Sequence, residues 1–560
     1  MRTRRFLPAV IACLAVVVLA GPSARPAAAQ APIALTGQVT SGGDGAMEGV
    51  LVSAKKTGST VTITVASDRQ GHYRFPSAKL EPGRYDLSIR AVGFELSRPT
   101  AVDVAPPQTT RADLELRKTA DLAKQLTNAE WLLSMPGPQN HKSALLGCVQ
   151  CHTLERVVRS PHDAAAFLSV MQRMGSYTNQ STPLHMQMRR AERLLEVRGE
   201  ERERARRALA EFLAGVNLGP GSTWKYPLAT LPRPAGRGTR VVITEYDLPR
   251  PTIQPHDVIV DPDGIAWFCN FGEQTLGKLD PRTGKVTEYT VPELKPGFPT
   301  GALSVRFDRD SNLWLGMMFQ GGIAKFERKT EKFSTWSLPA EHNRDMTQVN
   351  MTSPFYSFVD GKVWTNNNGF AAVHRLDLAS GKFETWEPFR DGVAKGRTHN
   401  IYDVIADSQN NAWFTDFANE HIGRIDARTG KLSLYTIPTP RSAPRRAQMD
   451  AQDRLWFAEY RGNKIGVFDT KAERFQEWEA PTPWSQPYDV ALDKNGDAWT
   501  GSMLNDRILR LDTKTGTFTE YMLPRQTNIR RVFVDNSTSP PTFWVGNNHG
   551  ASVIKLEPLD

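Results

Sequence analysis

Tryptophans recur at nearly regular intervals through the C-terminal part of the chain, and this repeat limits the possible folds more than any other feature. Neighbouring members are 43 to 50 residues apart, and the set is Trp267, Trp314, Trp364, Trp413, Trp456, Trp499 and Trp544. A turn such as "DPDG" precedes most of them, and a short strand pattern such as "TEYTVP" ends most units. One unit of four short strands cannot bury both of its faces alone, so neighbouring units must stack. We therefore predict a mainly β protein with a seven-bladed β-propeller over residues 236–560.

One segment outside the seven units matches their final strand. "RVVITEYDLP" (240–249) precedes the first complete unit. A ring of blades closes when strands from both ends of the propeller share one blade, so we expect this segment to pair with the seventh blade. The aspartate-rich turns are compatible with calcium sites as well as with hairpins, but their presence in most blades favours hairpin geometry.

The repeat units resemble those of the virginiamycin B lyase (streptogramin lyase) family. The segments "NAWFTDFANEHIGRIDARTGKLSLYTIP" (411–438) and "RLWFAEYRGNKIGVFD" (454–469) carry this resemblance, which covers the whole propeller. The resemblance implies the propeller fold. It also implies a lyase that opens a cyclic depsipeptide by elimination, with a histidine base and a magnesium ion held by glutamates.

The lyase residues are only partly matched. The family pattern needs Glu-x-His at the start of one blade, whereas none of the 11 histidines has a glutamate two positions earlier. The blade that supplies Glu459 begins with Arg445 and Arg446, which cannot act as a base at neutral pH and would repel a divalent cation. His399, paired with Asp416, is the remaining candidate for a catalytic histidine. We therefore expect the fold without the mechanism, and Mg²⁺ only if the lyase interpretation holds.

Residues at the starts of blades are expected to face one mouth of the central channel, because the innermost strands line it. Together with residues of the loops after the tryptophans, they are expected to form a ring that could bind an anionic or polar small molecule. The alternative is that each side chain satisfies neighbouring backbone in a narrow channel. The main ligand candidates are His256, Arg445, Arg446, Glu459, Tyr488 and Arg531. The wider ring contains Asp257, Arg306, Tyr356, Tyr402, Asp403, Asp489, Arg530, Asn270, Met317, Asn367, Asn547, Asn548 and His549.

The sequence "CVQCH" (148–152) lies before the repeats and is the attachment signature of a c-type haem. Cys148 and Cys151 are one helical turn apart, so each thiol can form a thioether with a porphyrin vinyl group while His152 reaches the iron as proximal ligand. A zinc site would need a second Cys or His pair nearby, and a thioredoxin-type pair needs a βαβ context. A plain disulfide leaves His152 unexplained. The remaining Cys269, beside a tryptophan, is expected to be a buried apolar thiol.

The flanks of this motif predict a small all-α haem domain, similar to cytochrome c, over residues 119–222. Apolar residues recur at helical spacing in 127–137, 162–177 and 206–217, and the last segment resembles the C-terminal helix of class I cytochromes c. A distal methionine ligand would favour electron transfer over oxygen chemistry. Met174 is our first candidate, and the alternatives are Met171, Met186, Met188, His162 and His185.

Residues 32–118 alternate in a β pattern interrupted by glycine-rich turns, which predicts an Ig-like β-sandwich. The stretches "SDRQGHYRF" and "LEPGRYDLSIRAVGF" resemble the carboxypeptidase regulatory-like domains. That resemblance implies a spacer or adhesive module without catalytic residues.

The N-terminus has the pattern of a bacterial signal peptide. Arginines precede an apolar run, and small residues at 27–31 offer a cleavage site, so we expect residues 1–31 to be removed and no membrane anchor to remain. Loss of four arginines lowers the formal charge from +9 to +5. The basic stretch 196–213 has interleaved glutamates, so we expect no nucleic-acid partner.

These features predict a periplasmic or secreted monohaem cytochrome whose propeller binds a substrate or a redox partner, for example a quinone-cofactor dehydrogenase. One haem without a second cofactor favours an electron-transfer protein or subunit over an independent enzyme. Two alternatives remain open. The chain could be a lyase of the streptogramin B type that opens a cyclic ester, or a non-catalytic extracellular binding protein.

Overall fold

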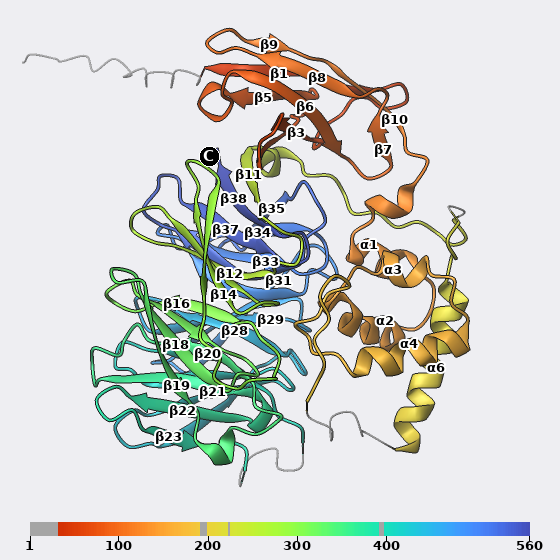
Figure 1. Cartoon of the computed structure of the whole chain (residues 1–560). Helices are drawn as coiled ribbons and strands as arrows, with labels where there is room; N and C mark the ends of the chain where they lie inside the picture. Colours follow the sequence, from red (N-terminus) through yellow and green to blue (C-terminus); the bar gives the residue numbers. More distant parts are fainter. Residues whose placement is uncertain (1–31, 191–198, 222–223, 391–396, 560) are drawn as a thin grey trace, which may run out of the picture.

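The computed structural model describes residues 32–190, 199–221, 224–390 and 397–559 (Figure 1). The predicted signal peptide and part of the basic stretch 196–213 lie outside these residues. Within the described ranges, no helix combines the length and the apolar character that crossing a bilayer requires.

The N-terminal strands form a β-sandwich, as the alternating pattern predicts. One sheet has the order β2-β1-β10-β7, with β5 and β9 also paired to β1, and the other contains β4-β3-β6-β8. Leu35, Val52, Tyr73 and Phe75 belong to the buried core. The strands are β1 (Ile33–Ser41), β2 (Gly45–Ala46), β3 (Leu51–Lys56), β4 (Val61–Ala66), β5 (His72–Pro76), β6 (Gly83–Arg90), β7 (Phe94–Leu96), β8 (Thr100–Val104), β9 (Thr110–Arg111) and β10 (Leu114–Lys118).

Helices fill the segment between the sandwich and the propeller. They are η2 (Leu122–Gln125), α1 (Asn128–Ser134), α2 (Gln139–Ala144), η3 (Leu145–Gln150), α3 (Glu155–Val158), α4 (Ala164–Gly175) and α6 (Glu200–Val216). α1 begins at a capping box: the side chain of Thr127 accepts a hydrogen bond from the Glu130 amide, and the side chain of Glu130 accepts one from the Thr127 amide. α4 and α6 pack against each other and bury Phe167 and Leu213. The helical character is observed, and the assignment to the cytochrome c fold stays a prediction.

Four-stranded sheets follow one another around a ring, as the tryptophan repeat predicts (Figure 1). Their first strands contact each other in sequence, from β12 through to β36, and β36 contacts β12. The described residues thus form seven blades, with β11 (Val241–Asp247) as the last strand of the seventh.

Blades one to three consist of β12 (Pro255–Val260), β13 (Ala266–Asn270), β14 (Thr275–Asp280), β15 (Lys285–Thr290), β16 (Ser304–Phe307), β17 (Leu313–Gly316), β18 (Gly322–Glu327), β19 (Lys332–Ser337), β20 (Val349–Ser353), β21 (Lys362–Asn367), β22 (Ala372–Asp377) and β23 (Phe383–Trp386). Blades four and five consist of β24 (Ile401–Ala406), β25 (Ala412–Asp416), β26 (His421–Ile425), β27 (Leu432–Thr436), β28 (Pro444–Met449), β29 (Arg454–Glu459), β30 (Lys464–Asp469) and β31 (Arg474–Glu479). Blades six and seven add β32 (Pro487–Leu492), β33 (Ala498–Ser502), β34 (Arg507–Asp512), β35 (Thr517–Met522), β36 (Ile529–Asp535), β37 (Thr542–Asn547) and β38 (Ser552–Pro558).

The repeated tryptophans are buried, and in five blades an aspartate of the preceding turn holds the indole. Trp413 Nε1 donates to the Asp407 carboxylate at 3.0 Å, and the other oxygen of Asp407 accepts backbone amides of the turn. The same pairing joins Trp267 to Asp261, Trp314 to Asp308, Trp456 to Asp450 and Trp499 to Asp493. These aspartates therefore stabilise the turns between strands, as the hairpin interpretation predicts.

β11 closes the ring, as expected, and also joins the propeller to the sandwich. It pairs antiparallel with β38 on one edge and with β4 of the sandwich on the other. An eight-stranded sheet therefore runs through both parts (Figure 1). Successive side chains of β11 point to opposite faces, so that Val242 belongs to the sandwich core and Ile243 to a propeller core.

Candidate functional site

The CVQCH motif begins in the last turn of the short helix η3. The amides of Cys151 and His152 donate to the Cys148 carbonyl at 3.2 and 3.3 Å, so the two cysteines are one turn apart. Both thiols are free. His152 Nδ1 lies 3.0 Å from the Thr153 carbonyl oxygen, so Nδ1 carries the proton and Nε2 is the ring nitrogen that could bind a metal.

The two thiols differ from the reactive pair of a disulfide oxidoreductase. Burial, together with the nearby Cys151, raises the pKa of Cys148 to about 11. Burial also raises the pKa of Cys151, although the cations Arg530 and Arg189 act in the opposite direction. Redox dithiols of the thioredoxin type depend on a lowered pKa of the attacking cysteine. The environment of this motif therefore argues against that alternative.

Three polar side chains of blade seven hold the backbone of the motif. Asn528 Nδ2 donates to the Val149 carbonyl at 3.1 Å. Arg530 Nη2 and His549 Nε2 both donate to the Gln150 carbonyl, at 2.8 and 2.9 Å. The sequence placed Arg530 and His549 at the mouth of the propeller, but no pattern in it indicated that their partner is the CVQCH segment.

The helical segment covers the same mouth. Tyr402, Tyr460, Tyr488, Met503 and Leu504 of the propeller share one buried apolar cluster with residues of the helices. Polar contacts join the same parts: the Ala129 amide and the side-chain amides of Gln180 and Gln187 donate to carbonyls of the propeller. The Gln180 carbonyl accepts from the Gln254 side chain. The predicted ligand face is therefore buried beneath helices.

Five mouth residues form one chain of hydrogen bonds in the centre of the propeller. The Tyr402 hydroxyl bonds to that of Tyr488, which lies 3.1 Å from His256 Nε2. His256 Nδ1 and Arg446 Nη1 each lie 2.8 Å from Asp257 Oδ1. Burial lowers the pKa of His256 to about 3, so its imidazole is neutral. These hydrogen bonds therefore connect the hydroxyl groups of Tyr402 and Tyr488 to the buried ion pair of Asp257 and Arg446.

The remaining mouth arginines lie close to acids or to aromatic rings. Arg531 is 3.6 Å from Asp257 Oδ2 and 3.8 Å from Asp489 Oδ2. Arg306 donates to Asp403 at 2.9 Å. The guanidinium of Arg445 lies over aromatic rings, at 3.8 Å from the Tyr488 centroid. These contacts agree with the structural alternative for the ring, and small-molecule binding by it stays a prediction.

One residue of the predicted ring is a poor metal ligand, and another lies elsewhere. Glu459 ends β29, and burial beside Glu477 raises its pKa to about 8, so it is mostly protonated at neutral pH and a poor ligand for Mg²⁺. Tyr356 was predicted at a blade start, but it follows β20 and lies in the loop before β21. The prediction was wrong because the first strand of blade three is "VNMTS", which lacks the usual aspartate turn after it.

His399 and Asp416 do form the predicted pair. His399 Nδ1 lies 2.7 Å from Asp416 Oδ2, and its ring stacks on Phe389 with 3.8 Å between centroids. Burial raises the pKa of Asp416, but hydrogen bonds from His421, from the Asn400 amide and from His399 outweigh it and lower the pKa. Asp416 is thus fully engaged with local donors. The pair has a structural explanation, and a catalytic role for His399 stays a prediction.

One group of potential metal ligands lies at the channel centre. The ligand atoms of His256, Asp257 and Cys269 are within 4.8 Å of one another, and all three residues are buried. Arg446 already binds Asp257, and burial raises the pKa of the Cys269 thiol well above its usual value. A cation here would meet a guanidinium and a protonated thiol. Cys269 is the buried thiol that we expected.

Apolar side chains at the C-terminal end of α4 and in the segment that follows are exposed. Met174 is 39% exposed, and Leu184, Met186 and Met188 are 50 to 65% exposed. The charge of Arg189, next to Met188, is one of the two that oppose the raised pKa of Cys151. Met171 instead lines a cavity of 650 Å³ between α2, α4 and α6. The thioethers of Met174, Met186 and Met188 are therefore accessible to solvent.

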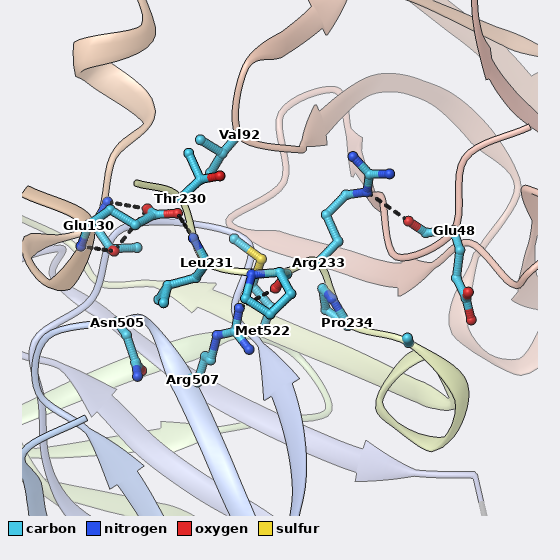
Figure 2. A pocket seen from close by; sticks show the side chains of 13 residues that line it. Glu48, Val92, Glu130, Thr230, Leu231, Arg233, Pro234, Asn505, Arg507 and Met522 are labelled. Atoms are coloured by element: carbon cyan, nitrogen blue, oxygen red, sulfur yellow. Dashed lines mark hydrogen bonds between the residues drawn. The ribbon is translucent and has the colours of Figure 1, made fainter. Parts of the chain in front are cut away.

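A second cavity, of 390 Å³, lies where the sandwich, the helices and the propeller meet (Figure 2). The segment before β11 crosses it and is tied to all three parts. Leu231 donates to Glu130 of α1 at 2.9 Å, Arg233 donates to the Glu48 carbonyl at 2.9 Å, and Arg507 donates to the Pro232 carbonyl. The cavity therefore marks a joint between the parts of the chain.

Two segments match known protein families. Residues 34–117 match the carboxypeptidase regulatory-like domain, and residues 393–558 match the virginiamycin B lyase family. Both agree with the resemblances drawn from the sequence. The chain therefore contains a regulatory-like sandwich and a propeller of the virginiamycin B lyase type. No curated protein matches the chain.

Solved structures similar to the chain include virginiamycin B lyase from Staphylococcus aureus, at 24% identity over 56% of this chain and 98% of that chain, with a TM-score of 0.47. A streptogramin B lyase structure has 24% identity over 58% of this chain and 100% of that chain, with a TM-score of 0.48. An extracellular domain from B. thetaiotaomicron has 14% identity over 55% of this chain and 41% of that chain, with a TM-score of 0.40.

Proposed function

We propose that this chain is an exported monohaem c-type cytochrome that transfers electrons in the periplasm, and that its propeller is the platform on which the haem peptide is fixed. The observation that carries the proposal is the position of the CVQCH motif, whose carbonyls are held by Asn528, Arg530 and His549 of blade seven. A periplasmic redox protein, such as a quinone-cofactor dehydrogenase, is the proposed partner.

The donor set fits haem c. Cys148 and Cys151 would hold the porphyrin through thioethers, and His152 Nε2 would bind the iron. The exposed side chains of Met174, Leu184, Met186 and Met188 are of the apolar kind that a bound porphyrin covers. When bound, the haem supplies one-electron chemistry. The chain's own residues supply a fixed peptide, and Arg530 places a positive charge beside it.

Lyase chemistry is less well supported by the same residues. Arg445 and Arg446 occupy the blade start where the family has its base and metal ligand, and both are buried. Burial and the charge of Glu477 raise the pKa of Glu459 to about 8, so this carboxyl group is mostly protonated at neutral pH. The non-catalytic binding protein remains the second candidate, and a colourless product in the experiment below would favour it.

Covalent haem attachment is tested with cysteine variants. Wild-type chain from a host with a haem-maturation system should show the sharp α-band of a reduced c-type haem, and its haem should stay bound after denaturation. The Cys148→Ser/Cys151→Ser variant should lose all covalent haem, because both thioether bonds are removed. Cys269→Ser is the matched control and should keep full haem content. A colourless wild type whose Cys148 and Cys151 react with an alkylating reagent would refute the proposal.

The distal ligand is tested with methionine variants. We expect Met174→Ala to lose the weak near-infrared charge-transfer band of methionine-ligated ferric haem and to have a lower midpoint potential. Met188→Ala, in the same exposed segment, is the matched control and should keep both. The opposite pattern would assign the ligand to Met188 and show that the assignment of Met174 is wrong.

A further inference from the structure

Two arginines at the mouth of the propeller carry buried charges without a carboxylate partner. Arg445 is 2% exposed and Arg530 is 1% exposed. Across the described ranges, no aspartate or glutamate lies within ion-pair distance of either, whereas Arg306 and Arg446 each pair with an aspartate, at 2.9 and 2.8 Å. Buried charges are normally paired, so these two cations need a counter-charge.

The acceptors that contact the two guanidinium groups are neutral. Arg530 donates to the side chain of Asn528 and to the Gln150 carbonyl. Arg445 Nη1 lies 3.6 Å from the sulfur of Met503, and a thioether is only a weak acceptor. Neither cation is therefore neutralised by the groups that hold it.

The tyrosines beside Arg445 do not supply the charge either. The Asp257 carboxylate accepts from His256 Nδ1, so the neutral imidazole accepts the proton of the Tyr488 hydroxyl at Nε2. The Tyr488 oxygen in turn accepts from the Tyr402 hydroxyl, which keeps its proton. Arg445 Nη2 therefore donates to a neutral phenol, at 3.2 Å from the Tyr402 oxygen. The counter-charge has to come from a bound anion.

Two hydrogen-bond donors beside each other are available for such an anion. Arg445 Nε and the Tyr460 hydroxyl are both buried, and neither has a hydrogen-bond partner within the described part of the chain. The Arg445 guanidinium carbon is 4.6 Å from the Tyr460 ring centroid and 4.8 Å from that of Phe417. Tyr460 and Met503 share their buried cluster with the helices, which cover this part of the mouth. A guanidinium offers donors only, so the group suits an anion and not a cation.

We propose that the mouth of the propeller binds a small monovalent anion, a halide ion or a carboxylate group, against Arg445 and Tyr460, beneath the helices. The guanidinium of Arg445 can bind this anion without losing an existing ion pair. Arg530 strengthens the positive potential, because its guanidinium carbon is 5.6 Å from the Tyr488 ring centroid and that of Arg445 is 3.8 Å from the same centroid.

The anion has two possible sources with the same chemistry. One is a free ion such as chloride or formate. The other is a propionate group of the haem that would be attached to Cys148 and Cys151, and this source rests on the proposed function. The binding site itself depends only on the buried cations, so it can be tested on chain without haem.

The site is tested by chloride titration of the full chain in its haem-free form, Cys148→Ser/Cys151→Ser. Replacing gluconate, which is too large for a buried site, by chloride at constant ionic strength should raise the thermal unfolding midpoint, because the anion binds only the folded chain. Adding Tyr460→Phe should weaken the apparent affinity for chloride about tenfold or more, since one hydrogen bond to a charged group is lost. Tyr435→Phe is the matched control, because the Tyr435 hydroxyl bonds to Glu473 from an outer strand, and it should leave this affinity unchanged.

Arg445→Met distinguishes an anion site from a purely structural arginine. It should abolish the chloride dependence without lowering the unfolding midpoint in gluconate, because it removes an unpaired buried cation. A structural role in packing against the rings predicts instead an equal loss of stability in both buffers. An unfolding midpoint of the haem-free chain that is the same in chloride and gluconate, with no heat of binding for chloride or formate, would overturn the inference.

A second measurement identifies the source of the anion and separates this inference from the proposed function. In wild-type chain with covalent haem, a chloride dependence equal to that of the haem-free chain would assign the site to a free anion. Its loss in the presence of haem would assign the site to a haem propionate. Wild type that attaches no haem would contradict the proposed function, and the chloride titration of the haem-free chain would still decide whether the site binds an anion.

Discussion

Replacing Ile243 with alanine should destabilise the propeller by about 2 to 5 kcal/mol, the usual cost of truncating a fully buried isoleucine. Ile243 is 0% exposed and belongs to a core cluster that also contains Trp499. β11 is the strand that closes the ring, so a cavity beside it weakens the closure. Urea unfolding followed by tryptophan fluorescence should show a transition at lower denaturant concentration.

The neighbouring residue provides the matched control. Val242 points to the other face of β11 and belongs to the sandwich core, and residues 32–118 contain no tryptophan. Val242→Ala should therefore leave the fluorescence transition close to that of wild type and should make the sandwich more sensitive to limited proteolysis. Equal shifts of the fluorescence transition in both variants would show that the two cores unfold as one unit.

Replacing Arg446 with methionine should cost about 3 to 5 kcal/mol, because it leaves the carboxylate of Asp257 buried without its main cation. The two side chains are fully buried and 2.8 Å apart. Removing both charges, in Arg446→Met/Asp257→Asn, should cost less than the single change, since no unpaired charge remains. Arg428→Met, at an exposed turn, is the control and should stay within about 0.5 kcal/mol of wild type.

Arg446→Met should also reverse the pH dependence of stability that Asp257 causes. In wild type, burial raises the pKa of Asp257, but Arg446 and His256 outweigh it and lower the pKa below the unfolded value. The stabilisation is therefore present at neutral pH and is lost only in strong acid. Without Arg446 the folded pKa rises, so stability should fall as the pH increases from acid to neutral. A free energy of unfolding that still rises over this interval would contradict this role of Arg446.

The sequence alone was sufficient for the repeating parts of the fold. The tryptophan period, the turns and the final-strand match at 240–249 predicted seven blades and their closure, because each of these features is local and repeats. The spacing of Cys148, Cys151 and His152 defined the haem hypothesis for the same reason. Tyr356 shows the limit of this approach, since the turn that aligns the other blades is absent from blade three.

Contacts between distant segments were decided only by the tertiary structure. Arg530 and Gln150 are 380 residues apart, and no periodicity relates them. The free edge of β11 could have remained exposed, but it pairs with β4 because an unpaired strand edge leaves backbone groups unsatisfied. The charge balance of the mouth likewise depends on which side chains the ring brings together. Local patterns therefore determined the blades, the sandwich and the motif, whereas packing in space determined that Arg445 faces Tyr402 and that blade seven holds the CVQCH segment.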